Sequence, residues 1–469
     1  MSDAPRRLSQ WAILSDRVSL WIVAALFAGA FFAEGYAADS VLRTSAWLAC
    51  AALGCLGIAG WAAGRGDGER WNAARWFAAL MLAAVGCGAL HLIPIAPEHA
   101  RELSPLWRDI LDSLAAGGIA APESVTLAIA PEHARRALNQ LIASALFFIG
   151  IVPLASRRSG AVALVSMVAV AAVAEGIVGL FQFLAWGLPR ARGAVFNPNH
   201  HAATVLMGLP LCFAGLVQWR RLNARFSEDL LGGTNPVLLL YGVGVAATLG
   251  WLAAFSRSSL LIAVLVLAVY VTIEGVGRWR RRERDVRLGI GALAIGTALL
   301  AMGAALSAVL VEGVFARLMD DDALSGNSRL HIWAASWRGL QETNWLGLGL
   351  GGVEFTINRY AEYPLLTIPI WSHNDWLQWV CDLGAPGVVV LMPLLAAFLV
   401  SATRDYRARR PLAGFADRML YRACLAGLAT ALLHAATDFH LRIPLTGFMV
   451  LTLVALVVQS GTLKVNLTR

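Results

Sequence analysis

His373 is the side chain in this sequence that is best placed to move a proton. It lies in the segment Trp371–Gly384, WSHNDWLQWVCDLG, in which Ser372 and Asp375 match a capping box ahead of an apolar helical run. The pattern predicts a helix whose first position is His373. A helix N-terminus attracts anions and favours neutral imidazole, which is the form that acts as a general base. A well-capped interfacial helix with an incidental histidine would give the same pattern, so both interpretations stay open at this point.

Arg329 is a candidate for binding a phosphate group. It belongs to the segment 328–341, SRLHIWAASWRGLQ, whose large apolar side chains recur at helical spacing. These side chains are Leu330, Trp333, Trp337 and Leu340. An amphipathic helix with Trp on one side and Arg on the other is expected at a membrane interface. Simple anchoring at the lipid surface accounts well for Arg338 and less well for Arg329.

Three more arginines lie where a positive charge needs a partner. Arg257, in FSRSSLL, separates two apolar runs with no room for a loop, so it either reaches the outer surface or serves a ligand. Arg190 and Arg192 precede Asn197 and His200 in the loop before the next apolar run. Because arginine binds phosphate with two parallel hydrogen bonds, these positions suit an anionic group.

Another polar group occurs near the C-terminal end, in HAATDFHLRIP. His434 and Asp438 are four residues apart, which predicts that they share one helix face, and Arg442 follows them. His434, Asp438 and His440 are residue types that bind metals, but no zinc motif is present, and we expect no metal site.

Together these residues suit a lipid-linked pyrophosphate held at the level of the lipid headgroups. Transfer of its sugar requires stabilisation of the departing pyrophosphate and a base for the acceptor hydroxyl. We expect pyrophosphate binding by Arg257, Arg329, Arg190 and Arg192. Supporting roles are expected for Asn197, His200, Asp375, His434, Asp438 and Arg442. No glycine-rich phosphate loop or serine nucleophile motif offers another chemistry.

The composition indicates which elements position these residues. The chain has 469 residues, of which 58% are hydrophobic and 14% are charged, and its mean hydropathy is +0.64. A soluble chain carries about 25% charged residues. These values exclude a soluble enzyme and a disordered chain, and they predict an all-α polytopic membrane protein. The six cysteines match neither a zinc site nor a disulfide framework.

Twelve apolar runs are long enough to cross a bilayer as helices. They lie roughly at 18–38, 46–63, 74–95, 138–155, 160–185, 202–218, 236–254, 258–276, 288–311, 384–402, 420–437 and 443–461. With the N-terminus inside, the cytoplasmic segments contain 25 of the 38 basic residues, as the positive-inside rule requires. We therefore expect both termini in the cytoplasm. Because the positive charge is spread over seven segments, we expect no nucleic-acid partner.

These runs divide the chain into five parts. Residues 1–94 hold the first three predicted spans, 138–311 hold spans four to nine, and 384–469 hold the last three. Two long loops, 95–137 and 312–383, are expected on the outer side, and the second is rich in Trp, Arg and His. The hexapeptide APEHAR occurs twice in the first loop, which predicts a duplicated helix start.

Five motifs in this order resemble the bacterial O-antigen ligase and polysaccharide polymerase superfamily, a group of O-antigen ligase-related membrane glycosyltransferases. They are NPNHHAA (197–203), FSRSSLL (255–261), SRLHIWAASWRGLQETNWLGLGLGG (328–352), SHNDWLQWVCDLGAPG (372–387) and HAATDFHLRIP (434–444). The similarity is clearest from about residue 190 to residue 445, whereas the N-terminal third matches only in hydropathy.

The resemblance implies a metal-independent helical membrane glycosyltransferase of the GT-C type, with no cofactor. It implies a glycan donor on undecaprenyl pyrophosphate, a lipid A core acceptor and a site facing the periplasm from the bacterial inner membrane, as in lipopolysaccharide biosynthesis. The family's histidine falls on His373, and its functional arginines fall on Arg257 and Arg329. In the N-x-N-H stretch, His201 stands where an aromatic residue is common in the family.

Two alternatives remain at this point. A polysaccharide polymerase of the same superfamily would pass the glycan to another lipid-linked repeat, and no motif separates these acceptors. A non-enzymatic membrane transporter is a different class of protein. Transporters usually carry more intramembrane ionisable groups or broken helices, whereas Glu175 is the single acidic residue deep inside a predicted span. This pattern favours the transferase.

Overall fold

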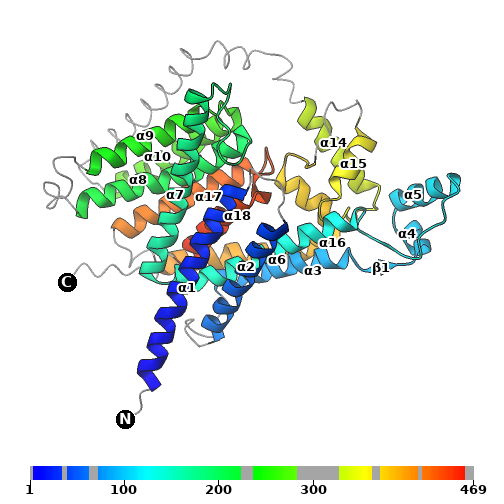
Figure 1. Ribbon diagram of the computed structural model, residues 1–469, viewed down its shortest axis with the longest axis horizontal. Helices are drawn as coiled ribbons and strands as arrows, with labels where there is room; N and C mark the ends of the chain where they lie inside the picture. Colours follow the sequence, from blue (N-terminus) through cyan, green and yellow to red (C-terminus); the bar gives the residue numbers. More distant parts are fainter. Residues whose placement is uncertain are drawn as a thin grey trace. The chain divides into compact units, whose positions relative to one another are not determined.

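The computed structural model describes residues 4–33, 40–62, 72–222, 236–281, 327–361, 370–409 and 415–459. The described part is mostly helical, as the composition predicts (Figure 1). The chain divides into two compact units. Unit 1 comprises Met1–Leu164, Ser328–Asp417 and Ala435–Arg469, and unit 2 comprises Val165–Asn327 and Arg418–His434.

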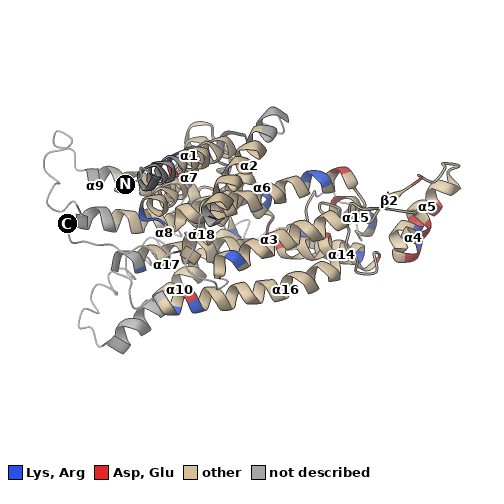
Figure 2. Ribbon diagram, turned by 90° about the horizontal axis from the view of Figure 1, so that it is seen from below, with Lys and Arg blue, Asp and Glu red and all other residues tan. Residues whose placement is uncertain are grey.

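Unit 1 contains the longer apolar helices that pack around α6. These helices are α1 (Ala4–Ala33), α2 (Ser40–Ala62), α3 (Ala73–Leu90), α6 (Pro131–Ala155), α16 (Asp375–Arg409) and α18 (Pro444–Gln459). α6 packs against α2, α3 and α18, and α16 packs along α3. Between Asp382 and Arg404, α16 carries no charged side chain, which is visible as its long tan stretch in Figure 2.

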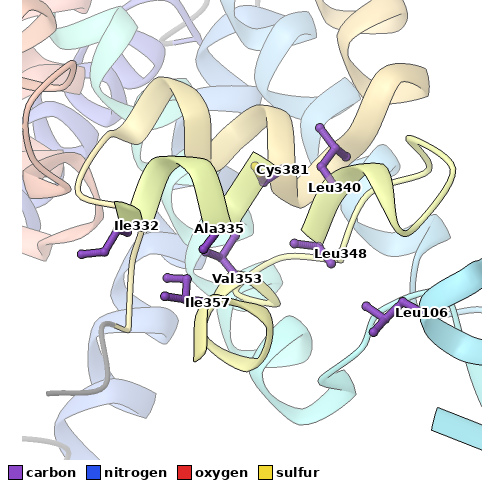
Figure 3. Close-up of a cluster of buried hydrophobic side chains, with 8 residues drawn as sticks. All are labelled: Leu106, Ile332, Ala335, Leu340, Leu348, Val353, Ile357 and Cys381. Atoms are coloured by element: carbon purple, nitrogen blue, oxygen red, sulfur yellow. The ribbon is translucent and has the colours of Figure 1, made fainter. Parts of the chain in front are cut away.

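Shorter elements of unit 1 lie in both predicted outer loops, and a 3-10 helix, η2 (His440–Arg442), precedes α18. The elements in the loops are β1 (Pro94–Ile95), α4 (Pro97–Leu103), α5 (Pro105–Ala116), β2 (Val125–Thr126), α14 (Asn327–Gln341) and α15 (Val353–Tyr360). The two loops pack on each other, since Leu106 N donates to Glu342 O at 2.8 Å. Their shared core consists of Leu106, Ile332, Ala335, Leu340, Leu348, Val353, Ile357 and Cys381 (Figure 3).

The two APEHAR copies begin two different helices, so the predicted duplicated helix start is confirmed. α4 begins at Pro97 and α6 begins at Pro131, each directly after an alanine. Proline suits the first helical position because no helical partner is needed for its missing N–H. Glu98 and Glu132 follow in the first turn, where a negative charge complements the helix dipole.

Among the residues that the structure describes, unit 2 contains most of α7 (Arg158–Ala185) together with α8 (Pro198–Leu222), α9 (Pro236–Leu252), α10 (Arg257–Arg281) and α17 (Phe415–His434). α8 packs against α9 and α10 around a core that includes Val205 and Trp251. Trp251 Nε1 donates to Ser259 Oγ at 2.6 Å and so ties α9 to α10 across their short connection.

Helix length and composition indicate a membrane protein. Among the described residues, the helices Ala73–Leu90, Pro131–Ala155, Arg158–Ala185 and Asp375–Ala408 are long and apolar enough to cross a membrane. Shorter apolar helices cover Ser45–Ala59, Leu240–Leu252, Arg257–Tyr270 and Pro444–Gln459. The described helices overlap eleven of the twelve predicted runs, and the run 288–311 lies outside the described residues.

Candidate functional site

α16 begins two residues later than the sequence predicts. Asn374 caps it, because its side-chain Oδ1 accepts a hydrogen bond from Leu377 N at 3.1 Å. The predicted capping box of Ser372 and Asp375 is therefore wrong. Ser372 Oγ donates to Asn374 O, and the Asp375 carboxylate accepts from Leu441 N at 3.0 Å, so both side chains serve other partners.

His373 precedes the helix and does not occupy its first position. Its φ of 52° lies in the left-handed region, which residues other than glycine adopt at an energetic cost. Its Nδ1 lies 3.3 Å from Asp438 Oδ1, and its ring meets the Phe439 ring edge to face at 4.9 Å between centroids. Contacts from a distant part of the sequence thus hold the imidazole in place.

Asp438 joins His373 to Arg329. The Asp438 side chain is only 3% exposed, and its Oδ2 lies 3.7 Å from Arg329 Nη2 while Oδ1 faces the imidazole. The side chains of His373 and Arg329 are 30% and 34% exposed, so both are accessible to a substrate. Unit 1 therefore brings three of the predicted site residues into one cluster.

A buried ionic group adjoins this cluster. Arg442 Nη2 donates to Asp382 Oδ2 at 2.9 Å, and Arg442 Nε lies 3.4 Å from Asp375 Oδ1. Neither carboxylate has exposed side-chain surface, and the guanidinium also lies over the rings of Trp371 and Trp379. Because two buried carboxylates share one guanidinium, their burial depends on Arg442.

Backbone hydrogen bonds connect this ionic group to the His373–Asp438 pair. Asp375 N donates to Ala435 O at 2.7 Å and to Asp438 O at 3.2 Å. Residues 435–442 are thereby held against the start of α16, with Arg442 at one end of the segment. This arrangement brings Asp438 beside His373, although the two residues are 65 positions apart.

Asp382 and Gln378 are site residues that sequence reasoning missed. Gln378 Nε2 donates to Asp382 Oδ1 at 2.9 Å, and Gln378 Oε1 accepts from Ser372 N at 2.8 Å. Asp375, Gln378 and Asp382 recur at spacings of three and four residues, so they form one polar stripe on an apolar helix. That stripe is the sequence signal that would have identified them.

α16 is interrupted at Gly384, where φ is 65° and ψ is −172°. The glycine-rich segment 345–351 lies against this break. Residues 348 and 349 donate their amides to the carbonyls of Cys381 and Asp382 at 2.9 and 3.0 Å, and Ala385 N donates to Trp345 O at 2.7 Å. The backbone groups that the break would leave without helical partners are thus satisfied inside the protein.

α14 carries Arg329 but buries a different face from the predicted one. The buried positions are Ile332, Ala335, Ser336, Gly339 and Leu340. Leu330 and Trp337 are exposed, and Trp333 is only partly buried, so the prediction of a single Leu330, Trp333, Trp337 and Leu340 face is wrong. Gly339 and Ser336 let α14 approach Thr356 of α15 and Cys381 of α16 closely, around the shared core.

In unit 2, two of the predicted arginines lie at the short connection between α9 and α10. Arg190 Nε donates to Ala254 O at 2.8 Å, and its Nη2 donates to Asn199 Oδ1 at 3.2 Å. Arg257 begins α10 at the end of this connection. Arg192, two positions after Arg190, is exposed. Unit 2 therefore has its own group of arginines.

The remaining predicted residues have other surroundings. Asn197 Oδ1 accepts from Asn199 N at 2.9 Å at the start of α8, and His200 is buried. His434 ends α17, and Asp438 lies beyond that helix, so the prediction that they share a helix face is wrong. Beyond the helix end, the carbonyls of residues 435 and 438 accept the amide of Asp375.

One comparison with known proteins bears on this site. Residues 242–392 match the family model described as O-antigen ligase. The matched region contains Arg257, Arg329 and His373, and it ends before Asp438 and Arg442. No curated protein sequence matches the chain. The order of the motifs, the apolar helices and this match over about a third of the chain agree, and they support the resemblance to the O-antigen ligase superfamily.

Proposed function

We propose that this protein is a glycosyltransferase of the bacterial inner membrane that moves glycan from undecaprenyl pyrophosphate to lipid A core on the periplasmic side. The match of residues 242–392 to the O-antigen ligase family supports a lipid-linked glycan as the class of substrate. The observation that carries the proposal is the cluster of His373, Asp438 and Arg329. In this cluster a buried carboxylate contacts a partly exposed imidazole and a partly exposed guanidinium.

His373 acts as the general base for the acceptor hydroxyl. When Nδ1 carries a proton, it donates to Asp438 Oδ1, and Nε2 is then the basic nitrogen. The carboxylate favours this tautomer and stabilises the imidazolium that forms when Nε2 takes the hydroxyl proton. The acceptor oxygen then bonds to the sugar carbon as the bond from that carbon to the pyrophosphate oxygen breaks.

Arg329 stabilises the departing pyrophosphate, which gains negative charge as that bond breaks. Its ion pair with Asp438 is 3.7 Å long, which exceeds a direct hydrogen bond. A planar fork of N–H donors on a partly exposed side chain can bind two phosphate oxygens at once. This chemistry supports charge stabilisation by arginine and, with it, transfer that is independent of a metal ion.

The arginines of unit 2 bind the same class of anion. Arg190 contacts the connection that ends at Arg257, and Arg192 is exposed close by in the chain. Several guanidiniums grouped at the end of apolar helices are costly unless they have anionic partners or reach the membrane surface. A phosphate-bearing donor would provide such a partner.

The proposed topology has twelve spans, with both termini in the cytoplasm and the His373 cluster in the periplasm. The partition of basic residues supports this orientation. A cysteine at Gln341, exposed on α14, should react with an impermeant thiol reagent in intact spheroplasts. A cysteine at Arg407, exposed near the end of α16, should react only after permeabilisation. The reverse pattern would contradict the orientation.

A membrane transporter is the second candidate, because broken helices often form transporter binding sites. The break at Gly384 is the feature that favours it. Against it, the carbonyls of Cys381 and Asp382 and the amide of Ala385 already have partners within the protein. In a transporter site such groups are offered to the substrate or to a coupling ion.

Gene deletion followed by glycolipid analysis tests the proposed function. We expect long polymer to accumulate on the lipid carrier, which is the result for a ligase. Accumulation of single lipid-linked repeats would indicate a polymerase of the same superfamily. Unchanged surface glycan would contradict both and favour the transporter. Complementation with His373→Ala, at normal protein levels in the membrane, should leave the deletion phenotype in place.

A further inference from the structure

A buried ionisable pair contacts the arginine-bearing segment of unit 2. Glu175 of α7 and His201 of α8 have no exposed side-chain surface, and His201 Nδ1 lies 3.0 Å from Glu175 Oε1. His201 Nε2 lies 3.1 Å from Gly250 O. A carboxylate buried within an apolar helix is costly, so such residues usually have a specific role. The catalytic chemistry proposed above uses neither residue.

The hydrogen-bond partners fix the net charge of this pair. A backbone carbonyl only accepts, so His201 Nε2 carries a proton to bond with Gly250 O. One further proton lies between His201 Nδ1 and Glu175 Oε1, on either the nitrogen or the oxygen. The pair is electrically neutral in both cases, as imidazolium with carboxylate or as imidazole with carboxylic acid. Its neutrality lowers the cost of burial.

Glu175 also binds the backbone that carries the arginines. Its Oε2 accepts from Ala194 N at 3.0 Å, and its Oε1 accepts from Val195 N at 3.4 Å. Gln182, on the same helix, accepts from the amides of residues 192 and 193 at 3.2 and 2.8 Å. Two side chains of α7 thus bind four consecutive amides.

Gly193 brings this backbone into direct contact with the pair. Its φ is 63°, and a Cβ atom at this position would overlap the Glu175 carboxylate and the His201 ring. On the other side, Ala191 N donates to Ala253 O at 2.9 Å. The segment is therefore held between α7 and the α9–α10 connection.

We propose that Glu175, together with His201, is a positioning residue for Arg190 and Arg192. The neutral pair fixes the backbone of residues 190–195 so that the two guanidiniums are presented to the pyrophosphate of the donor. This inference rests on the proposed function, because it takes the lipid-linked donor as the anion. Glu175 acts through the amides that it binds and does not itself contact the donor.

The first test follows the segment without measuring activity. Val195 is buried, so in a chain without the six native cysteines a Val195→Cys thiol reacts with maleimide only when the segment opens. Glu175→Gln replaces one acceptor oxygen by an NH2 group, so either Ala194 N or Val195 N loses its acceptor. Loss of such hydrogen bonds should raise the labelling rate roughly tenfold. Val170→Ala, at an exposed position of α7, is the matched control and should leave the rate unchanged. An unchanged rate in Glu175→Gln would overturn the inference.

The second test asks whether the segment serves the donor. Transfer is measured in membrane vesicles with the lipid-linked glycan that accumulates in the deletion strain. Glu175→Gln should reduce kcat/KM about tenfold, mainly through a higher KM for the donor. The same substitution should have little further effect in an Arg192→Ala background, because the two changes act on one interaction. Equal losses in both backgrounds would overturn the positioning role.

Different experimental results would contradict the inference and the proposed function. If the arginine substitutions lower transfer but Glu175→Gln changes neither labelling nor KM, the positioning role alone is wrong. If Arg190→Ala and Arg192→Ala both leave transfer unchanged, donor binding by these arginines is wrong, and the inference falls with it. If Glu175→Gln does not accumulate in the membrane, Glu175→Asp supplies the same two measurements, because it keeps the carboxylate but shortens its reach to Ala194 N and Val195 N.

Discussion

In two regions of the molecule, a buried carboxylate binds backbone that carries proposed site residues. The negative charge of the carboxylate is balanced differently in the two regions. At the start of α16, Asp375 and Asp382 share the guanidinium of Arg442. In unit 2, Glu175 shares one proton with His201. The first group needs a permanent cation and keeps an excess of negative charge when both carboxylates are ionised, whereas the second is neutral.

This difference predicts how substitutions in each region affect folding and activity. Without Arg442, two buried carboxylates would lack their counter-ion, which is a large penalty for folding. With Gln at position 175, the partner is a histidine that can be neutral, so the penalty is smaller and falls on the adjoining backbone. We therefore expect substitutions at the start of α16 to separate into catalytic and folding effects, while those around Glu175 act mainly on activity.

The largest effect on activity is expected at His373. His373→Ala removes the proposed base and should reduce transfer by about 10²–10⁴-fold. Because alanine is strained at the observed φ of 52°, His373→Asn is the matched control, since asparagine tolerates left-handed backbone. Both variants should be inactive, but Asn should keep more of the normal thermal stability in detergent. A fully active variant of either kind would contradict the role of His373.

The pH dependence of transfer separates two roles for the same imidazole. If His373 is the base, activity rises with pH as the ring loses its proton and becomes able to accept another. If the ring instead acts as a cation beside the pyrophosphate, activity falls over the same range. Asp438→Asn should reduce the base activity without removing it, because the carboxylate only orients and stabilises the ring.

The largest effect on stability is expected at Arg442. Arg442→Ala leaves Asp375 and Asp382 buried without their counter-ion and should lower the stability of unit 1 by about 3–5 kcal/mol. Arg442→Lys keeps the charge but loses the planar fork and the contact with Trp371 and Trp379. It should therefore lower the stability of unit 1 by less than Arg442→Ala does.

Asp382→Asn provides the matched control for Arg442. It leaves one carboxylate with one guanidinium, which is the neutral balance seen in unit 2. Its effect on the unfolding temperature in detergent should be clearly smaller than that of Arg442→Ala. Equal losses from Asp382→Asn and Arg442→Ala would show that charge balance does not explain the stability of this region.

Arg329 and Arg257 allow a test of phosphate binding in both units. Arg→Lys should reduce transfer nearly as much as Arg→Ala, because lysine cannot form a two-pronged contact. Loss of a charge-assisted hydrogen bond of about 2–4 kcal/mol corresponds to roughly 30- to 1000-fold in rate. Arg338→Lys, at an exposed position of α14, should be neutral. If Arg257→Lys retains full activity, Arg257 is only an anchor at the membrane surface.

Features that depend on local sequence were predictable, and contacts between distant segments were not. Apolar runs located the helices because a bilayer requires length and composition that can be read within one segment. The same local reading favoured Ser372 over Asn374 as the cap of α16, since both residue types cap helices. The Asp375 carboxylate does not take part in a capping box, because it accepts a hydrogen bond from Leu441 N.

The same distinction between local sequence and long-range contacts applies to the candidate site. The types and order of the motifs identified His373, Arg329 and Asp438, but their pairing depends on contacts across 65 or more residues. The face of α14 was mispredicted because large aromatic side chains were taken as the core, whereas the buried positions are Ile332, Ala335, Ser336, Gly339 and Leu340. Close packing is decided by the partner surface, which one helix does not encode.

The smallest effect distinguishes the observed cap from the predicted one. Asn374→Ala removes only the hydrogen bond from Leu377 N and should lower stability by about 1 kcal/mol with most activity retained. Under the predicted capping box, Asp375→Ala would have had a similarly small effect. In the structure Asp375 binds Leu441 N and Arg442, so Asp375→Ala should cost more than Asn374→Ala and should also displace Asp438, lowering transfer. Thermal unfolding and transfer rates of the two variants, compared side by side, check this order. If Asn374→Ala and Asp375→Ala lose equal stability, the Asp375 side chain contributes no more than a helix cap does. Its buried ion pair with Arg442 would then not stabilise the site.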